Sequence, residues 1–169
     1  GVPTIFNALG PLTNPAGARR QLIGVYEPSL VGLVTETLKR LGSEQAMVVH
    51  GDDGLDEATL TTTSSAMMLS KGEISRLTVD PSALDLSRCS LDALRVDSVE
   101  AAAEVIQSVL AGEKGPRRDI TLLNAALALQ VAGVVEEATD GIKLAEAAID
   151  SVSAQRSLGL LRRVSADRS

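Results

Sequence analysis

Residues 21–49 read QLIGVYEPSLVGLVTETLKRLGSEQAMVV, and this stretch decides the fold. It begins with an apolar run, Gln21 to Val25, that favours a buried strand. Apolar residues then recur at helical spacing from Pro28 to Leu41, and Gly42 supplies a natural stop. The stretch ends in Ala46 to Val49, a continuous apolar run typical of a strand buried on both faces of a parallel sheet. Together these elements predict a βαβ unit and an α/β fold, with a mostly parallel central sheet flanked by helices.

The elements outside this unit are predicted from turn formers and caps. Residues 66–69 and 74–79 flank a turn that contains Gly72, which predicts a β-hairpin, and we expect it to form a small antiparallel excursion. A short helix is expected over residues 4–9, ending at Gly10. Further helices are predicted after the capping candidates Asp97, Asp119 and Asp140, with a last amphipathic helix near residues 158–164.

The composition narrows the class of protein. The chain has 169 residues, of which 44% are hydrophobic, and this is enough for one domain with a buried core. Its formal net charge of −6 and its near lack of aromatic residues argue against nucleic-acid binding. No apolar run approaches the length of a membrane span. Cys89 is the single cysteine and cannot form an internal disulfide, so a reducing, cytoplasmic setting is expected.

Residues 48–57, VVHGDDGLDE, form the segment most suggestive of chemistry. Four carboxylates follow directly after a predicted buried strand, and in open α/β sheets ligands bind at the carboxyl ends of the strands. Neighbouring carboxylates repel one another unless a cation offsets their charge. Magnesium uses only one or two protein carboxylates, and Asp56 and Glu57 are the candidate ligands. An exposed, solvated turn is the alternative, whereas the spacing does not fit a calcium-binding EF-hand loop.

Other polar residues carry weaker signals. His50, the one histidine, is expected to bond with nearby backbone, and Cys89 lacks the partner that a nucleophile needs. Arg117 and Arg118 are expected to form structural ion pairs, although a phosphate contact is the alternative. The sequence contains no P-loop, no GxGxxG fingerprint and no nucleophile elbow. The hydroxyl-bearing residues that could meet phosphate, or could simply be strand residues, are Thr59, Thr61, Thr62, Thr63, Ser64 and Ser65.

Three segments together resemble the anthranilate phosphoribosyltransferase family, within the nucleoside phosphorylase and phosphoribosyltransferase fold. They are GVPTIFNALGPLTNPA at residues 1–16, HGDDGLDE at residues 50–57, and GPRRD at residues 115–119 running on to LLNAA at residues 122–126. Their order and spacing also match the family. The resemblance implies that residues 1–169 are the C-terminal α/β catalytic portion of such an enzyme. The family's N-terminal helical domain and diphosphate-binding loop are then expected to be absent.

The resemblance also implies a reaction. The phosphoribosyl group of phosphoribosyl pyrophosphate is transferred to the amino group of anthranilate, which releases diphosphate, in tryptophan biosynthesis. By the family pattern, Asp56 and Glu57 hold Mg²⁺ on the departing diphosphate. The principal substrate-binding residues are not matched in this chain, so the isolated chain is expected to be inactive. The full-length protein is expected to be a homodimer. Two alternatives stay open: a relative that resembles pyrimidine nucleoside phosphorylase, and a non-catalytic remnant of the fold.

Overall fold

The computed structural model describes residues 10, 12 and 16–166. The helix expected over residues 4–9 lies outside them. The elements in chain order are β1 (Arg20–Gly24), α2 (Pro28–Arg40), β2 (Gln45–Gly51), β3 (Ser64–Ser70), β4 (Glu73–Val79), the 3-10 turns η2 (Pro81–Leu84) and η3 (Leu91–Ala93), α3 (Val99–Leu110), α4 (Pro116–Ala132), α5 (Ala138–Asp150) and α6 (Ser153–Ala166). None of the helices in this described part is long and apolar enough to cross a membrane.

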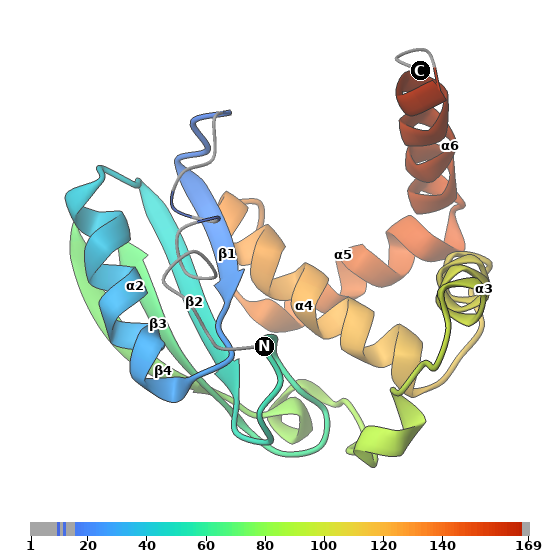
Figure 1. The fold of residues 1–169 in the computed structure, drawn as a ribbon, viewed down its shortest axis with the longest axis horizontal. Helices are drawn as coiled ribbons and strands as arrows, with labels where there is room; N and C mark the ends of the chain where they lie inside the picture. The colour runs from blue at the N-terminus through green and yellow to red at the C-terminus, as the bar shows by residue number, and fades with distance from the viewer. Residues whose placement is uncertain (1–9, 11, 13–15, 167–169) are drawn as a thin grey trace.

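The predicted βαβ unit forms the centre of the molecule. Strands β1 and β2 pair in parallel, and α2 connects them. Alternate residues of β2 point to opposite faces of the sheet, so each face needs its own apolar cover. Ala46 and Val48 pack with α2 on one face, while Met47 and Val49 pack with α4 on the other. Figure 1 shows these two helices on opposite sides of the strands. Because both faces are covered, β2 is a continuous apolar strand, as predicted.

The predicted hairpin is also present, as β3 and β4. Its turn has positive φ at both Lys71 (51°) and Gly72 (80°), the backbone form that matches the twist of a two-residue hairpin. The hairpin does not stand apart from the sheet, however, because β3 pairs antiparallel with β2. The sheet has the order β1-β2-β3-β4. The α/β class is therefore confirmed, but within the described strands the pairing is parallel only between β1 and β2, not mostly parallel.

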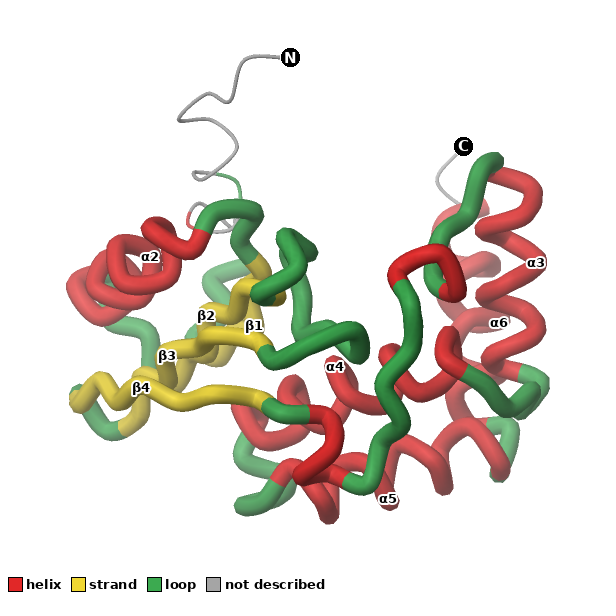
Figure 2. The backbone as a smooth tube through the Cα atoms, turned by 90° about the horizontal axis from the view of Figure 1, so that it is seen from below, coloured by secondary structure: helices red, strands yellow, loops and turns green. Residues whose placement is uncertain are grey.

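The remaining helices form a second layer beyond α4. Helices α3 and α6 lie side by side at the end farthest from the sheet (Figure 2). The helices predicted beyond residue 97 are all present, but their starts differ from those predicted. Ser98, not Asp97, caps α3 by accepting a hydrogen bond from the N–H of Ala101. The caps of α4 and α5 are Gly115 and Glu137, which place Asp119 and Asp140 inside the first turn, where a negative charge favours the helix dipole.

Candidate metal-binding loop at the end of strand β2

The loop that follows β2, residues 52–63, is called the acidic loop below, and it leaves the sheet at the carboxyl edge shared by the two parallel strands. It is folded tightly on itself. The N–H of Gly51 donates to the carbonyl of Leu55 (2.8 Å), and the N–H of Asp52 donates to the carbonyl of Thr63 (3.0 Å). Gly54 has a φ of 99°, a conformation that side chains rarely allow. The four carboxylates are therefore carried by a defined turn rather than by a loose surface loop.

Two of the four carboxylates are held by hydroxyl groups of the protein. Asp53 accepts hydrogen bonds from the hydroxyls of Thr59 (2.6 Å) and Thr61 and from the N–H of Leu55. Partial burial by itself raises the pKa of Asp53, but these hydrogen bonds outweigh burial, and the pKa lies below its ordinary value. Asp53 is therefore ionised at neutral pH, and its hydrogen bonds stabilise the loop.

Asp52 is held in the same way from the far side of the loop. Its carboxylate accepts from the hydroxyls of Thr63 (2.6 Å) and Ser65 (2.9 Å). The hydroxyl of Ser64 accepts from the N–H of Thr59 (2.9 Å). The loop hydroxyls considered above as phosphate donors are thus directed largely toward the loop itself, which supports the structural interpretation of these residues.

Asp56 and Glu57 differ from the first pair of carboxylates. Both side chains are exposed, and within residues 16–166 neither takes part in a hydrogen bond or an ion pair. The pKa of Glu57 is raised, first because surrounding protein removes part of its water and then because Asp56 and Asp53 lie nearby with the same charge. Such unpaired, mutually repelling carboxylates are suited to bind a cation.

This donor set fits magnesium. In the part of the chain described, no group of three or more His, Cys, Asp or Glu side chains is arranged to hold a metal ion. An all-protein cage is therefore not formed by these residues. Mg²⁺ commonly binds through one or two carboxylates and completes its octahedron with water and phosphate oxygens, which is what Asp56 and Glu57 can offer.

The backbone under this pair is fixed by close contacts. A β-carbon at Gly24 would lie 1.5 Å from the carbonyl oxygen of Asp56, so β1 and the acidic loop touch backbone to backbone. A β-carbon at Gly51 would lie 2.6 Å from a carboxylate oxygen of Asp53. The role of Gly24 was missed from the sequence, although a glycine inside a predicted strand is a known sign of close backbone approach.

Asn124 of α4 lies in the segment LLNAA, residues 122–126, and its side chain supports the acidic loop. Its side-chain amide donates to the carbonyl of Ala58 (2.9 Å) and accepts from the N–H of Ala58 (3.0 Å), directly after Glu57. The signal in the sequence was an amide within the apolar run Leu122 to Ala126, where a buried polar group needs a partner. Its partner, 66 positions away, could not be identified from local pattern.

The other polar residues singled out in the sequence serve the fold. His50 Nδ1 lies 2.8 Å from the carbonyl oxygen of Val25, as expected of a structural histidine. Burial raises the pKa of the Cys89 thiol, as do the charges of Asp119 and Asp53, which disfavours a nucleophilic role. Arg118 is 1% exposed and pairs with Asp150 of α5 at 2.8 Å, so the predicted structural ion pair is confirmed for this residue. Arg117 instead donates to the carbonyl of Arg95 (2.9 Å).

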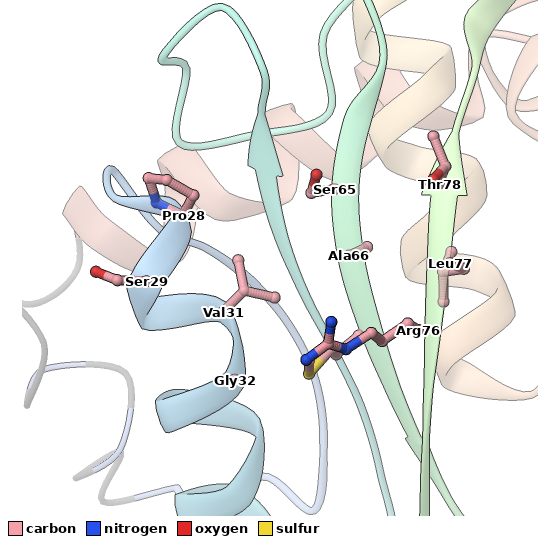
Figure 3. A pocket seen from close by; sticks show the side chains of 10 residues that line it. Pro28, Ser29, Val31, Gly32, Ser65, Ala66, Arg76, Leu77 and Thr78 are labelled. Carbon is pink, nitrogen blue, oxygen red and sulfur yellow. The ribbon is translucent and has the colours of Figure 1, made fainter.

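A groove of about 600 Å³ lies beside the acidic loop, between α2 and strands β3 and β4. Figure 3 shows Pro28 and Ser29 at one wall, Ser65 and Thr78 at the other, and the Arg76 side chain reaching across from β4. Asp56 and Glu57 do not line this groove. The groove and the carboxylates of Asp56 and Glu57 are thus separate features.

Comparison with known proteins identifies the family. Residues 1–155 match the glycosyl transferase family, a/b domain. The chain belongs to this family. A curated relative from Pelobacter propionicus, an anthranilate phosphoribosyltransferase, is 47% identical over 99% of the chain and 48% of its own length. Another of the same name, from Methylobacillus flagellatus, is 43% identical over 98% of the chain and 48% of its length. The chain thus spans about half the length of these relatives.

Solved structures of the family agree with the fold. Anthranilate phosphoribosyltransferase from Thermus thermophilus superimposes with a TM-score of 0.87 at 36% identity, over the whole chain and 49% of that protein. The enzyme from Saccharomyces cerevisiae in complex with PRPP and Mg superimposes with a TM-score of 0.83 at 27% identity, over 94% of the chain and 46% of that protein. The resemblance drawn from the three motifs is therefore confirmed.

Proposed function

We propose that this chain supplies the magnesium-binding part of an anthranilate phosphoribosyltransferase. The full reaction transfers the phosphoribosyl group of phosphoribosyl pyrophosphate to the amino group of anthranilate and releases diphosphate. The observation that carries the proposal is the pair Asp56 and Glu57, two carboxylates without a protein partner in residues 16–166, at the carboxyl edge of β2. Relatives of this chain act as anthranilate phosphoribosyltransferases, and one is solved with Mg and PRPP.

The chemistry asked of these residues is electrostatic. As the bond from the anomeric carbon to the diphosphate breaks, positive charge grows on the ribose and negative charge on the leaving oxygens. A bound Mg²⁺ offsets that negative charge. Asp56 and Glu57 would hold the ion, while Asp53 and Asp52, tied down by hydroxyl groups, keep the loop in shape.

The proposal includes the setting of the whole protein. Because the chain spans about half the length of its relatives, we expect the 169-residue chain alone to turn over little or no substrate. We also propose that residues 1–169 form the C-terminal α/β portion of a cytoplasmic homodimer whose helical domain and diphosphate-binding loop lie upstream.

The test replaces both ligands without changing their shape. Asp56→Asn together with Glu57→Gln, in the protein extended upstream along its coding sequence, should lower Mg²⁺-dependent formation of phosphoribosyl-anthranilate by about a hundredfold or more, which is the scale of losing charge stabilisation at the leaving group. The matched control is Asp92→Asn with Glu100→Gln, which removes the same charge from exposed positions in the helical half. Unchanged magnesium dependence in the first variant would reject the assignment of the pair.

Two other outcomes point to the alternatives. An extended protein that folds, binds Mg²⁺ and uses phosphate with a nucleoside would be a relative of pyrimidine nucleoside phosphorylase. One that folds without either activity would be a non-catalytic remnant. Robust anthranilate transfer by the 169-residue chain alone would contradict the expectation that it is incomplete.

A further inference from the structure

The side chain of Asn124 pairs with the backbone of the acidic loop as one peptide group pairs with another. Nδ2 donates to the carbonyl of Ala58 (2.9 Å) and Oδ1 accepts from the N–H of the same residue (3.0 Å). Nδ2 also donates to the carbonyl of Ile120, one turn earlier on α4, at 3.1 Å. The amide is therefore fixed on its own helix, and it provides a hydrogen-bond partner for both the N–H and the carbonyl of Ala58.

Ala58 is the residue immediately after the metal pair, and it cannot move independently. Its exposed fraction is 0%, as is that of Thr59 and of Leu60. Ala58 and Leu60 lie in one apolar cluster with Leu123, the neighbour of Asn124 on α4. Helix packing and hydrogen bonding thus hold the same short segment.

The other side of the metal pair is fixed by β1. Gly24 lets the carbonyl oxygen of Asp56 approach so closely that no β-carbon fits between them. The backbone of Asp56 is thereby set against β1, and that of Ala58 against α4. Glu57 lies between two anchored points.

The carboxylates themselves have no such anchors. Because Asp56 and Glu57 make no hydrogen bond or ion pair within residues 16–166, the directions in which they leave the loop depend on the backbone. Residues that orient metal ligands from outside the coordination sphere commonly change metal affinity by about 10–100-fold when replaced.

We propose that Asn124 is a positioning residue for the metal pair, and that it acts by fixing the Ala58 peptide next to Glu57. This rests on the proposed function, in which Asp56 and Glu57 hold the ion. A purely structural role, joining α4 to the sheet, would lower stability without selective loss of metal affinity.

The experiment measures binding of Mn²⁺, as a stand-in for Mg²⁺, to the 169-residue chain by electron paramagnetic resonance titration of free Mn²⁺. Asn124→Leu removes both bonds to Ala58 at similar volume. The matched control is Gln45→Met, since Gln45 also bonds its side-chain amide to the α4 region, at the carbonyl of Gln130 (3.2 Å), from the opposite end of β2. Urea unfolding of both variants gives the loss of stability separately.

We expect Asn124→Leu to weaken Mn²⁺ binding about tenfold and Gln45→Met to leave it unchanged. Adding Asn124→Leu to Asp56→Asn/Glu57→Gln should produce no further weakening, because no ligand pair is left to position. Asn124→Ala, which keeps the helix and leaves room for water at Ala58, serves if the leucine variant does not fold.

The outcomes separate the two proposals. If Asp56→Asn/Glu57→Gln binds Mn²⁺ like the unsubstituted chain, the metal assignment fails and the role of Asn124 fails with it. If that variant loses Mn²⁺ but Asn124→Leu binds as well as Gln45→Met, the metal assignment stands and the positioning role alone is rejected.

Discussion

The acidic loop and helix α6 both carry exposed side chains, but they differ in how closely the underlying backbone is packed against the rest of the protein. At the loop, the exposed carboxylates of Asp56 and Glu57 stand on backbone fixed by Gly24 and by Asn124. At α6, Leu161 is 62% exposed, on a helix with no buried residue among those described. Exposure of a side chain therefore says little about how well it is held. A binding site combines free side-chain atoms with a firmly held backbone, and the loop has both.

The largest expected loss of stability comes from disrupting the contact between β1 and the acidic loop. Gly24→Ala places a β-carbon where the carbonyl oxygen of Asp56 lies, so the loop must shift. We expect the free energy of unfolding to fall by about 3 kcal/mol, the upper part of the range for overpacking, together with loss of Mn²⁺ binding. Urea unfolding followed by circular dichroism measures the first, and the Mn²⁺ titration measures the second.

The control for this substitution is another glycine. Gly32→Ala lies in α2, where the nearest atom to a new β-carbon is the terminal methyl of Met67 at 3.7 Å, an ordinary contact. It should stabilise the protein by up to about 1 kcal/mol, because alanine favours the helix. Equal stability of the Gly24 variant and the unsubstituted chain would mean that β1 does not fix the loop.

A smaller loss of stability is expected when the ion pair between Arg118 of α4 and Asp150 of α5 is removed. The hydrogen bond from Arg118 is the largest influence on the pKa of Asp150. Together with the charges of Arg118 and Lys114 it outweighs desolvation, so the pKa lies below its ordinary value of 3.8. The lowered value means that the stabilisation is fully present above the unfolded-state pKa and is lost as pH falls through the folded-state pKa. Asp150→Asn should therefore lower stability at pH 7 and flatten its decline as pH falls below the ordinary pKa of an aspartate.

This pH dependence is read from urea unfolding at several pH values. Asp92→Asn is the comparison, since Asp92 pairs with Arg95 at 3.5 Å on an open surface where ion pairs contribute little. A decline with acid that is as steep in Asp150→Asn as in the unsubstituted chain would show that the ion pair does not stabilise the contact between α4 and α5.

The smallest change in stability is expected from a substitution in α6. Leu161→Ala should change the free energy of unfolding by no more than about 0.5 kcal/mol, as for other surface positions. Thermal unfolding at two protein concentrations provides the measurement. A loss above about 1 kcal/mol, or one that depends on concentration, would show that α6 packs against another surface in solution.

Much of the fold could be predicted because its signals are local. The period of apolar residues predicted α2, and the continuous apolar run predicted β2. Gly72 marked the hairpin, although nothing local required Lys71 to adopt positive φ as well. The attachment of the hairpin to β2 was not predicted, because strand pairing is decided by tertiary contacts rather than by either strand alone.

In the candidate site, too, some features could be predicted from local sequence, and others depended on tertiary contacts. Asp56 and Glu57 were chosen from a cluster of four carboxylates after a buried strand, and the family resemblance supported that choice. Their assignment as ligands remains a prediction. That Asp52 and Asp53 are occupied by hydroxyl groups, and that Gly24 supports the loop, depended on distances that the sequence does not contain.

The bond between Asn124 and Ala58 also bears on the order of events during synthesis. It joins residues 66 positions apart, whereas the hairpin of β3 and β4 closes through two residues. Closing long loops costs chain entropy before the contact forms, so the hairpin can form early. At ribosomal speeds of about 5–20 residues per second, Ala58 is made roughly 3 to 13 s before its partner. Throughout that interval the newly made acidic loop lacks one of its two anchors, and only the docking of α4 completes it.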